Sequence, residues 1–279
     1  MSVLISAQEL GERISRGEAP VLLDVRWTLG DPHGHDHYRE GHLPGAVYVD
    51  LDRELASPGD PRDGRHPLPA PADLQAAARR WGLRDDGDTV VAYDAVNALA
   101  AARAWWLLRW AGFDAVQLLD GGLGAWRAAG LPLETGEVTP PAGDVRLDSG
   151  RLPTIPLDGV LAAARSGVLL DARAPERYRG DSEPIDPHAG HVPGAVNAPT
   201  GGNLGPDGRF LPAADLRRRF EGLGVHDGVE VGAYCGSGVT ATHEIAALAI
   251  AGFDAALFPG SWSQWSNHDE LPRAVGAER

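Results

Sequence analysis

Residues 230–251 read EVGAYCGSGVTATHEIAALAIA, and this stretch decides the fold. Residues 230–234 are typical of a buried β-strand, and 241–250 combine good helix formers with an apolar stripe. Between them lies a short loop that starts at Cys235 and has glycines at 236 and 238. Because glycine accepts positive φ without steric cost, such a loop can turn its backbone N–H groups inward over one atom. The stretch therefore predicts a strand, an anion-binding loop and a helix in direct succession.

Cys235 is the chain's one cysteine, and we interpret it as a nucleophile. Free cysteines are often small buried hydrophobes, which is the alternative interpretation. Here the inward N–H groups and the positive end of the following helix would stabilise a thiolate, the reactive form of the side chain. The setting therefore favours covalent chemistry.

The two halves of the chain carry the same five landmarks in the same order. Such repetition indicates two copies of one domain. The matched segments are VLLDVR 21–26 and VLLDAR 168–173, GHLPGA 41–46 and GHVPGA 190–195, VVAYD 90–94 and VGAYC 231–235, AGFDA 111–115 and 251–255, and LDG 119–121 and FPG 258–260.

We expect a first domain over residues 1–130, a linker rich in proline and glycine over 131–152, and a second domain over 153–279. Alternating strands and helices predict an α/β fold in which each domain is a mainly parallel sheet with helices on both faces. Reactive groups in such sheets lie beyond the carboxyl ends of the strands, where Cys235 stands. In the first copy, strands are expected over 21–23, 46–49, 89–93 and 115–119, and helices over 71–81, 99–111 and 122–129.

The shared landmarks near the strand ends are expected to be structural. Asp24 with Arg26, and Asp171 with Arg173, should pair with each other and with loop backbones, because unpaired buried charge is costly. The first loop differs from the second in one respect that matters: Asp94 stands where the second has Cys235, and the two loop glycines are missing. The first domain is therefore expected to be catalytically inert and to help form the substrate cleft.

Composition excludes several classes of function. The net charge of −14 gives no basic surface for nucleic acid or anionic lipid. No apolar run reaches the roughly 18–20 residues of a membrane helix, and the N-terminus lacks the pattern of a secretory signal. A single cysteine fits a reducing compartment. We expect a soluble, cytoplasmic protein with no nucleic-acid or membrane partner.

The tandem pattern resembles two-domain rhodaneses. It is carried by the Asp-x-Arg strand ends, the Gly-His-x-Pro-Gly-Ala turns, the inert first loop and CGSGVT at 235–240, which is similar to the loop of 3-mercaptopyruvate sulfurtransferases. ARAWWLLR at 102–109 also resembles their first-domain helix. The resemblance implies sulfur transfer through a persulfide on Cys235: a sulfur donor is attacked, pyruvate leaves, and a thiol, cyanide or thioredoxin-like reductant takes the outer sulfur. We expect no cofactor and no metal.

The resemblance also implies a proton relay and a binding loop. A proton must reach the pyruvate enolate, and the matching relay residues are Ser237, His66 and Asp52. The loop residues after the cysteine are uncharged, which suits 3-mercaptopyruvate better than dianionic thiosulfate, for which relatives carry cations there. These residues are Gly236, Gly238, Val239 and Thr240.

A carboxylate anchor is expected to be arginine, because its planar fork binds both oxygens. Arg177 matches the first anchor of the family. The second anchor position holds Asp186, which departs from the pattern. Arg179 is a candidate replacement, with a solvated surface charge as the alternative.

Other interpretations stay open. The chemistry can run on thiosulfate with cyanide as acceptor, or the protein can be a non-enzymatic persulfide carrier. A cysteine phosphatase needs an arginine about six residues after the cysteine, where this chain has Ala241. The histidines at 33, 35 and 37 could suggest a metal site, but we expect them to lie in a solvated loop.

Overall fold

The structure is a computed structural model that describes residues 2–85 and 87–278. Its contacts divide the chain into two compact units. The N-terminal unit comprises Met1–Ala56, Pro69–Leu152 and Asp207–Arg209, and the C-terminal unit comprises Ser57–Leu68, Pro153–Pro206 and Phe210–Arg279. The segment Ser57–Leu68 thus comes from the first repeat of the sequence but groups with the unit that contains Cys235. Nothing in the repeat pattern predicts this exchange.

The N-terminal unit contains a parallel five-stranded sheet with the order β1-β5-β4-β2-β3. Leu22 of β2 pairs with Val91 of β4, so the strongly apolar strands lie at the centre of the sheet. The expected strands after β1 are all present, with ends that differ by at most one residue. The strands are β1 (Leu4–Ile5), β2 (Val21–Asp24), β3 (Val47–Tyr48), β4 (Val90–Tyr93) and β5 (Val116–Leu119).

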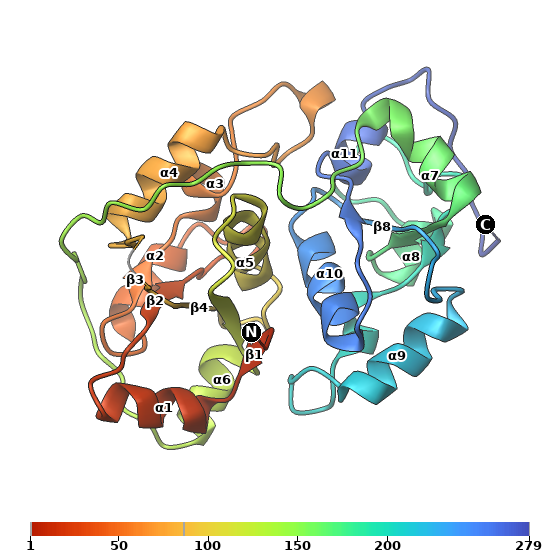
Figure 1. The fold of residues 1–279 in the computed structure, drawn as a ribbon. Helices are drawn as coiled ribbons and strands as arrows, with labels where there is room; N and C mark the ends of the chain where they lie inside the picture. The colour runs from red at the N-terminus through yellow and green to blue at the C-terminus, as the bar shows by residue number, and fades with distance from the viewer. Residues whose placement is uncertain (1, 86, 279) are drawn as a thin grey trace. The chain divides into compact units, whose positions relative to one another are not determined.

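Helices cover this sheet on both faces (Figure 1). The amphipathic helix α1 begins after Ser6, whose hydroxyl accepts the N–H of Glu9 at 3.1 Å, and with α6 it buries a core that includes Leu10 and Trp126. Helix α5 packs against β4 and β5. The helices of this unit are α1 (Ala7–Ser15), α2 (Gly34–Glu40), α3 (Leu51–Glu54), α4 (Pro71–Arg80), α5 (Ala101–Trp110) and α6 (Gly122–Ala128).

The C-terminal unit repeats the plan with a parallel four-stranded sheet in the order β7-β6-β8-β9. The edge position that β1 holds in the first unit is taken by a short extended segment: the N–H of Ile155 donates to the carbonyl oxygen of Leu257 at 2.7 Å. The strands are β6 (Val168–Asp171), β7 (Val196–Asn197), β8 (Val231–Tyr234) and β9 (Ala256–Leu257).

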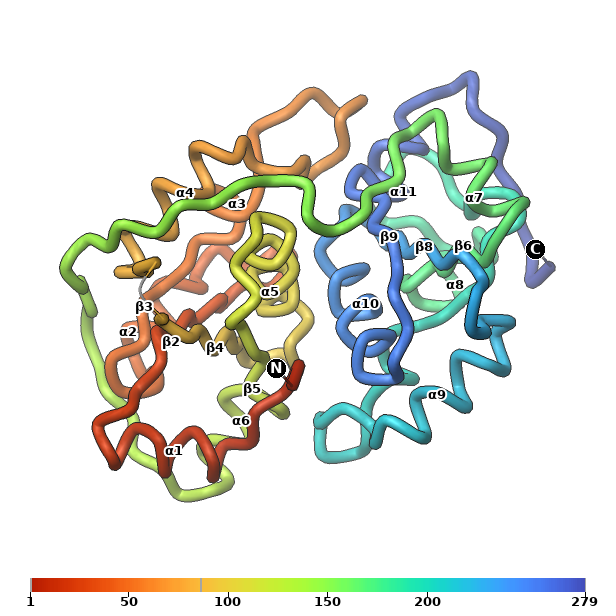
Figure 2. Tube along the Cα trace, viewed as in Figure 1, coloured from red at the N-terminus to blue at the C-terminus, as the bar shows by residue number. Residues whose placement is uncertain are grey.

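Helix α10 packs on β8, β9 and α9, whereas α7 packs on β6 and β8 (Figure 2). The tandem α/β fold with helices on both sheet faces is confirmed. The remaining elements are η1 (Pro61–Asp63), η2 (Leu157–Gly159), α7 (Val160–Ser166), α8 (Pro175–Arg179), η3 (Thr200–Asn203), α9 (Ala213–Gly222), α10 (Thr240–Ala251) and α11 (Ser261–Trp265).

The charged strand ends are tied together as expected. Arg26 contacts Asp24 at 2.6 Å and donates to the carbonyl oxygen of Gly41 at 3.1 Å. Arg173 contacts Asp171 at 2.6 Å and donates to the carbonyl oxygen of Gly190 at 2.7 Å. These buried pairs hold the turn after the first crossover against the end of the central strand in both units, which confirms their scaffold role.

The histidine-rich segment differs from expectation, because α2 covers Gly34–Glu40 where a loop was expected. The exposed imidazoles contact carboxylates on the surface, with 3.2 Å from His37 to Asp31 and 2.9 Å from His35 to Glu137. Within the part of the chain that the structure describes, no group of three or more His, Cys, Asp or Glu side chains is placed to hold a metal ion. Among the same residues, no helix has both the length and the apolar character needed to cross a membrane.

Candidate active site

Cys235 follows β8 directly, at the carboxyl end of the C-terminal sheet. Its side chain is almost fully buried, and its sulfur accepts the backbone N–H of Gly238 at 3.2 Å. Gly238 has φ +79°, and a side chain there would collide with the carbonyl oxygen of Pro259. Only glycine therefore lets the loop turn this N–H onto the sulfur.

Ser261, the first residue of α11, anchors the cysteine loop. The N–H of Cys235 donates to the hydroxyl of Ser261 at 3.1 Å, and that hydroxyl donates to the carbonyl oxygen of Phe258 at 3.0 Å. Ser261 has φ +54°, a conformation that usually costs a non-glycine residue about 1–3 kcal/mol. Its hydroxyl accepts the buried N–H of Cys235, which would otherwise lack a partner. This explains why a serine occupies a position whose backbone conformation favours glycine.

The loop continues into α10 through Val239 and Thr240. Val239 is buried and precedes the first helical residue, Thr240, which is half-buried. The 12-residue helix α10 thus begins next to Cys235, so its positive end lies on the side of the sulfur. This arrangement favours negative charge at the loop.

Ser237 and His66 lie within hydrogen-bonding distance in the C-terminal unit, with 2.8 Å between the hydroxyl oxygen and Nδ1. Both side chains are mostly buried. His66 belongs to the exchanged segment Ser57–Leu68. The structure therefore brings together two of the three expected relay residues next to the cysteine.

Asp52, the third expected relay residue, lies in the first turn of α3 in the N-terminal unit. One of its carboxylate oxygens accepts the indole N–H of Trp27 at 3.2 Å. Its place in the relay stays a prediction.

Arg177, on α8, lies beside the cysteine loop. A methyl group built on Gly236 would be 3.4 Å from Nη1 of Arg177. The guanidinium is held by Glu183, with contacts of 2.6 and 3.2 Å, and by Asp186 at 3.2 Å. An arginine fixed in this way is placed to meet an anion near the sulfur. Arg179, by contrast, forms an exposed ion pair with Asp181 at 2.7 Å.

Arg65 is a residue of this site that the sequence analysis missed. Its Nη1 contacts the carboxylate of Asp186, and its Nη2 lies 3.1 Å from a methyl group built on Gly236. The side chain of Asp186 is only 2% exposed, and this burial raises the pKa of its carboxyl, with the charge of Arg65 opposing the rise. A clue was present, because an acidic residue at an anchor position predicts a compensating cation elsewhere.

In the N-terminal unit, the side chain of Asp94 fills the loop that corresponds to the cysteine loop. The carboxylate of Asp94, which is completely buried, accepts four backbone N–H groups at 2.8–2.9 Å. The same loop position that holds a sulfur in the second unit therefore holds a fixed carboxylate in the first. The donors belong to Val96, Ala98, Ala100 and Ala101.

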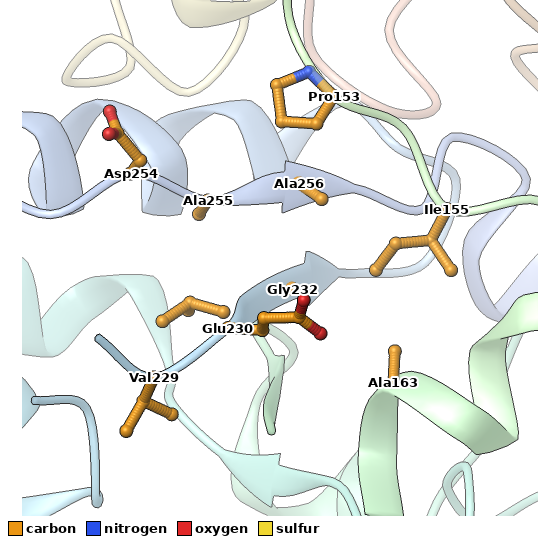
Figure 3. Close-up of a pocket in the computed structure, with 10 residues that line it drawn as sticks. Pro153, Ile155, Ala163, Val229, Glu230, Gly232, Asp254, Ala255 and Ala256 are labelled. Carbon is orange, nitrogen blue, oxygen red and sulfur yellow. The ribbon is translucent and has the colours of Figure 1, made fainter. Parts of the chain in front are cut away.

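A cavity of about 380 Å³ in the C-terminal unit lies away from these residues (Figure 3). Val231, at the start of β8, lines the cavity, whereas Cys235 follows the end of the strand, about 13 Å further along. The cavity therefore belongs to the amino edge of the sheet and is separate from the reactive edge. Its lining residues are Pro153, Ile155, Ala163, Val229, Glu230, Val231, Gly232, Asp254, Ala255 and Ala256.

A model of the rhodanese-like domain matches residues 6–129 and 158–268. The chain belongs to the rhodanese family. Both repeats of this rhodanese are thus accounted for, which confirms the resemblance seen in the Asp-x-Arg, turn and loop motifs.

Relatives with assigned names span nearly the whole rhodanese chain. It is 50% identical to a Mycobacterium tuberculosis protein named "Putative thiosulfate sulfurtransferase SseB", over 98% of this chain and 97% of the relative. It is 48% identical to a "Probable 3-mercaptopyruvate sulfurtransferase" of Pseudomonas aeruginosa, over 98% of both. The crystal structure of Escherichia coli SseA, a 3-mercaptopyruvate sulfurtransferase with the rhodanese fold, matches with a TM-score of 0.82 and 30% identity, covering 94% of this chain and 99% of that one.

Proposed function

We propose that this rhodanese is a sulfurtransferase that moves sulfur from 3-mercaptopyruvate to a thiol or cyanide acceptor through a persulfide on Cys235. The observation that carries the proposal is a buried sulfur that accepts the N–H of Gly238, with the Ser237–His66 pair two residues further on. The names of the relatives from P. aeruginosa and E. coli support the same donor.

The proposed reaction accounts for each bond and for the proton that the leaving group needs. The thiolate of Cys235 attacks the thiol sulfur of the donor, an S–S bond forms, and the donor's C–S bond breaks with its electron pair passing to carbon. The leaving group is the enolate of pyruvate, which needs a proton at carbon. Ser237, hydrogen-bonded to His66, is placed to deliver that proton, and Asp52 is the proposed carboxylate partner of the histidine. Cyanide or a thiol then attacks the outer sulfur and restores the thiolate.

The same geometry supports the binding contacts that we propose. Gly236, Gly238, Val239 and Thr240 form an uncharged loop around the sulfur, and Arg177 provides a guanidinium for the donor's carboxylate. We also propose a thioredoxin-like reductant as a physiological acceptor and a cytoplasmic location, both of which fit a chain with a single cysteine.

The direct test is the intact mass of the protein after treatment with 3-mercaptopyruvate. We expect a gain of one sulfur atom that is lost on adding cyanide or a reductant. The same gain should be absent from the Cys235→Ser variant. A mass that stays unchanged in the wild-type protein would contradict the persulfide.

Thiosulfate is the second candidate donor, because a relative that is 50% identical carries it in its name. We expect kcat/KM to be higher for 3-mercaptopyruvate, since residues Gly236–Thr240 themselves are uncharged and the planar fork of Arg177 fits a carboxylate. Steady-state assays with both donors and one acceptor decide this, and a higher value for thiosulfate would reverse the assignment. Transfer of only one sulfur per chain with either donor would instead indicate a carrier.

Replacing Ser237 with alanine should separate the two donors. We expect kcat with 3-mercaptopyruvate to fall about 100-fold, because the enolate loses its proton donor. The thiosulfate reaction should change much less, since sulfite leaves as a stable anion. The exposed residue Ser182 provides the matched control, Ser182→Ala. Equal losses with both donors would show that Ser237 shapes the loop instead of moving a proton.

A further inference from the structure

We propose that Arg65 is the second guanidinium that holds the donor's carboxylate, and that Asp186 is the residue that positions it. The inference rests on the proposed function, because it names a further binding residue of the same site. Arg65 would thus take the role left open by the acidic residue at position 186.

Both guanidinium groups converge on one point of the cysteine loop. A methyl group built on Gly236 would lie 3.1 Å from Nη2 of Arg65 and 3.4 Å from Nη1 of Arg177. Gly236 is the residue next to Cys235, and a side chain there would crowd the guanidinium of Arg65, so glycine lets both cations lie against the cysteine loop. A carboxylate bound to the outward N–H groups of the two forks would therefore lie close to the reacting sulfur.

Asp186 links the two arginines. One of its oxygens contacts Nη1 of Arg65, and the other lies 3.2 Å from Nη2 of Arg177. Because the carboxylate is buried and bound on both sides, it fixes the separation and direction of the two guanidinium groups. It leaves Nη2 of Arg65 and Nη1 of Arg177, the atoms nearest Gly236, for a ligand.

Arg65 has donor capacity that the protein does not use. Among residues 2–85 and 87–278, its buried Nε has no hydrogen-bond partner. A buried donor without a partner is destabilising, and such groups are rare in folded proteins. An anionic ligand with an oxygen that reaches this Nε would give the donor its acceptor.

Ser263 fixes Arg65 relative to the loop. Its hydroxyl accepts the backbone N–H of Arg65 at 3.1 Å, and its own N–H donates to the carbonyl oxygen of Gly236 at 2.8 Å. One residue of α11 therefore holds the backbone of both the candidate anchor and the glycine beneath it. These two hydrogen bonds fix the backbone of Arg65 relative to Gly236 in the folded C-terminal unit.

The hydrogen-bond donors near the loop fit a carboxylate. Arg65 and Arg177 are matched by Asp186 and Glu183, and Glu183 also contacts Arg173 at 3.4 Å. The two oxygens of a single carboxylate can use the free N–H groups of the two planar forks. Arg65 therefore favours a carboxylate-bearing donor.

The kinetic test is Arg65→Ala with 3-mercaptopyruvate as the donor. We expect KM to rise about 10- to 100-fold, the effect of losing a charged hydrogen-bond pair, while kcat stays within about threefold. Retained kcat also shows that the variant is folded. Arg65→Lys should give an intermediate KM, because a point charge lacks the planar fork. Arg218→Ala, at a side chain that is 71% exposed on α9, is the control.

A binding test separates this inference from the proposed function. Pyruvate, the probe, is titrated calorimetrically into Cys235→Ser and into Cys235→Ser/Arg65→Ala. Binding that weakens at least about 10-fold in the double variant supports Arg65 even if 3-mercaptopyruvate is not turned over. Turnover of 3-mercaptopyruvate with unchanged KM and unchanged pyruvate affinity on loss of Arg65 overturns the inference and leaves the function standing.

Discussion

Replacing Cys235 with serine is expected to lower kcat by about 10⁴-fold or more, whichever sulfur donor is used. The hydroxyl of serine stays protonated at neutral pH and cannot carry the outer sulfur through a persulfide, so the covalent step is lost. The measurement is the steady-state rate of pyruvate or sulfite release at saturating donor.

Folding must be checked in the same variant. The sulfur accepts the N–H of Gly238, and a serine oxygen can accept the same donor, so we expect a thermal unfolding midpoint close to that of the wild type. A variant that is folded and retains more than a tenth of the wild-type rate would remove the nucleophile from the mechanism.

Replacing Asp94 with alanine is expected to destabilise the protein by about 4 kcal/mol or more. The carboxylate satisfies four backbone N–H groups inside the loop, and removing it would leave buried donors without acceptors, at about 1–3 kcal/mol each. The measurement is the free energy of unfolding from urea titration, provided that the transition is two-state. A loss of activity alone would not distinguish destabilisation from a defect in catalysis.

Two further variants define the cause. Asp94→Asn keeps the shape but turns an N–H₂ group toward two of the donors, so it should lose about half as much stability as alanine. Asp114→Ala, at an exposed aspartate of the same unit, should change stability by less than about 0.5 kcal/mol. A loss below about 1 kcal/mol in Asp94→Ala would mean that the loop relaxes and water replaces the carboxylate.

Much of the fold was predictable because its signals are local. Each central strand is a short apolar run ending in Asp24 or Asp171, and the repeated turns mark where the chain crosses back, so the tandem sheets follow from the pattern. The cysteine loop was predictable for the same reason, since the glycines at 236 and 238 and the helix after them are contiguous.

The site's long-range partners were less accessible. Arg65 contacts Asp186, which lies 121 positions later in the sequence. Arg65 belongs to the first repeat, but its segment groups with the C-terminal unit. No periodicity encodes such an exchange, because a short irregular segment docks through a few side chains instead of a repeating face. The helix α2 was missed because its histidines and Gly34 have weak helix propensity, and packing of Tyr38 in the core outweighs it.

The exchanged segment Ser57–Leu68 has a consequence for how this enzyme can be divided. A polypeptide restricted to the second repeat would keep the reactive thiol but would lack the imidazole of His66 and the cation of Arg65. The two repeats are therefore not independent units, because twelve residues of the first, 57–68, group with the unit that contains Cys235. We expect deletion of the first repeat to remove two of the proposed site residues along with it.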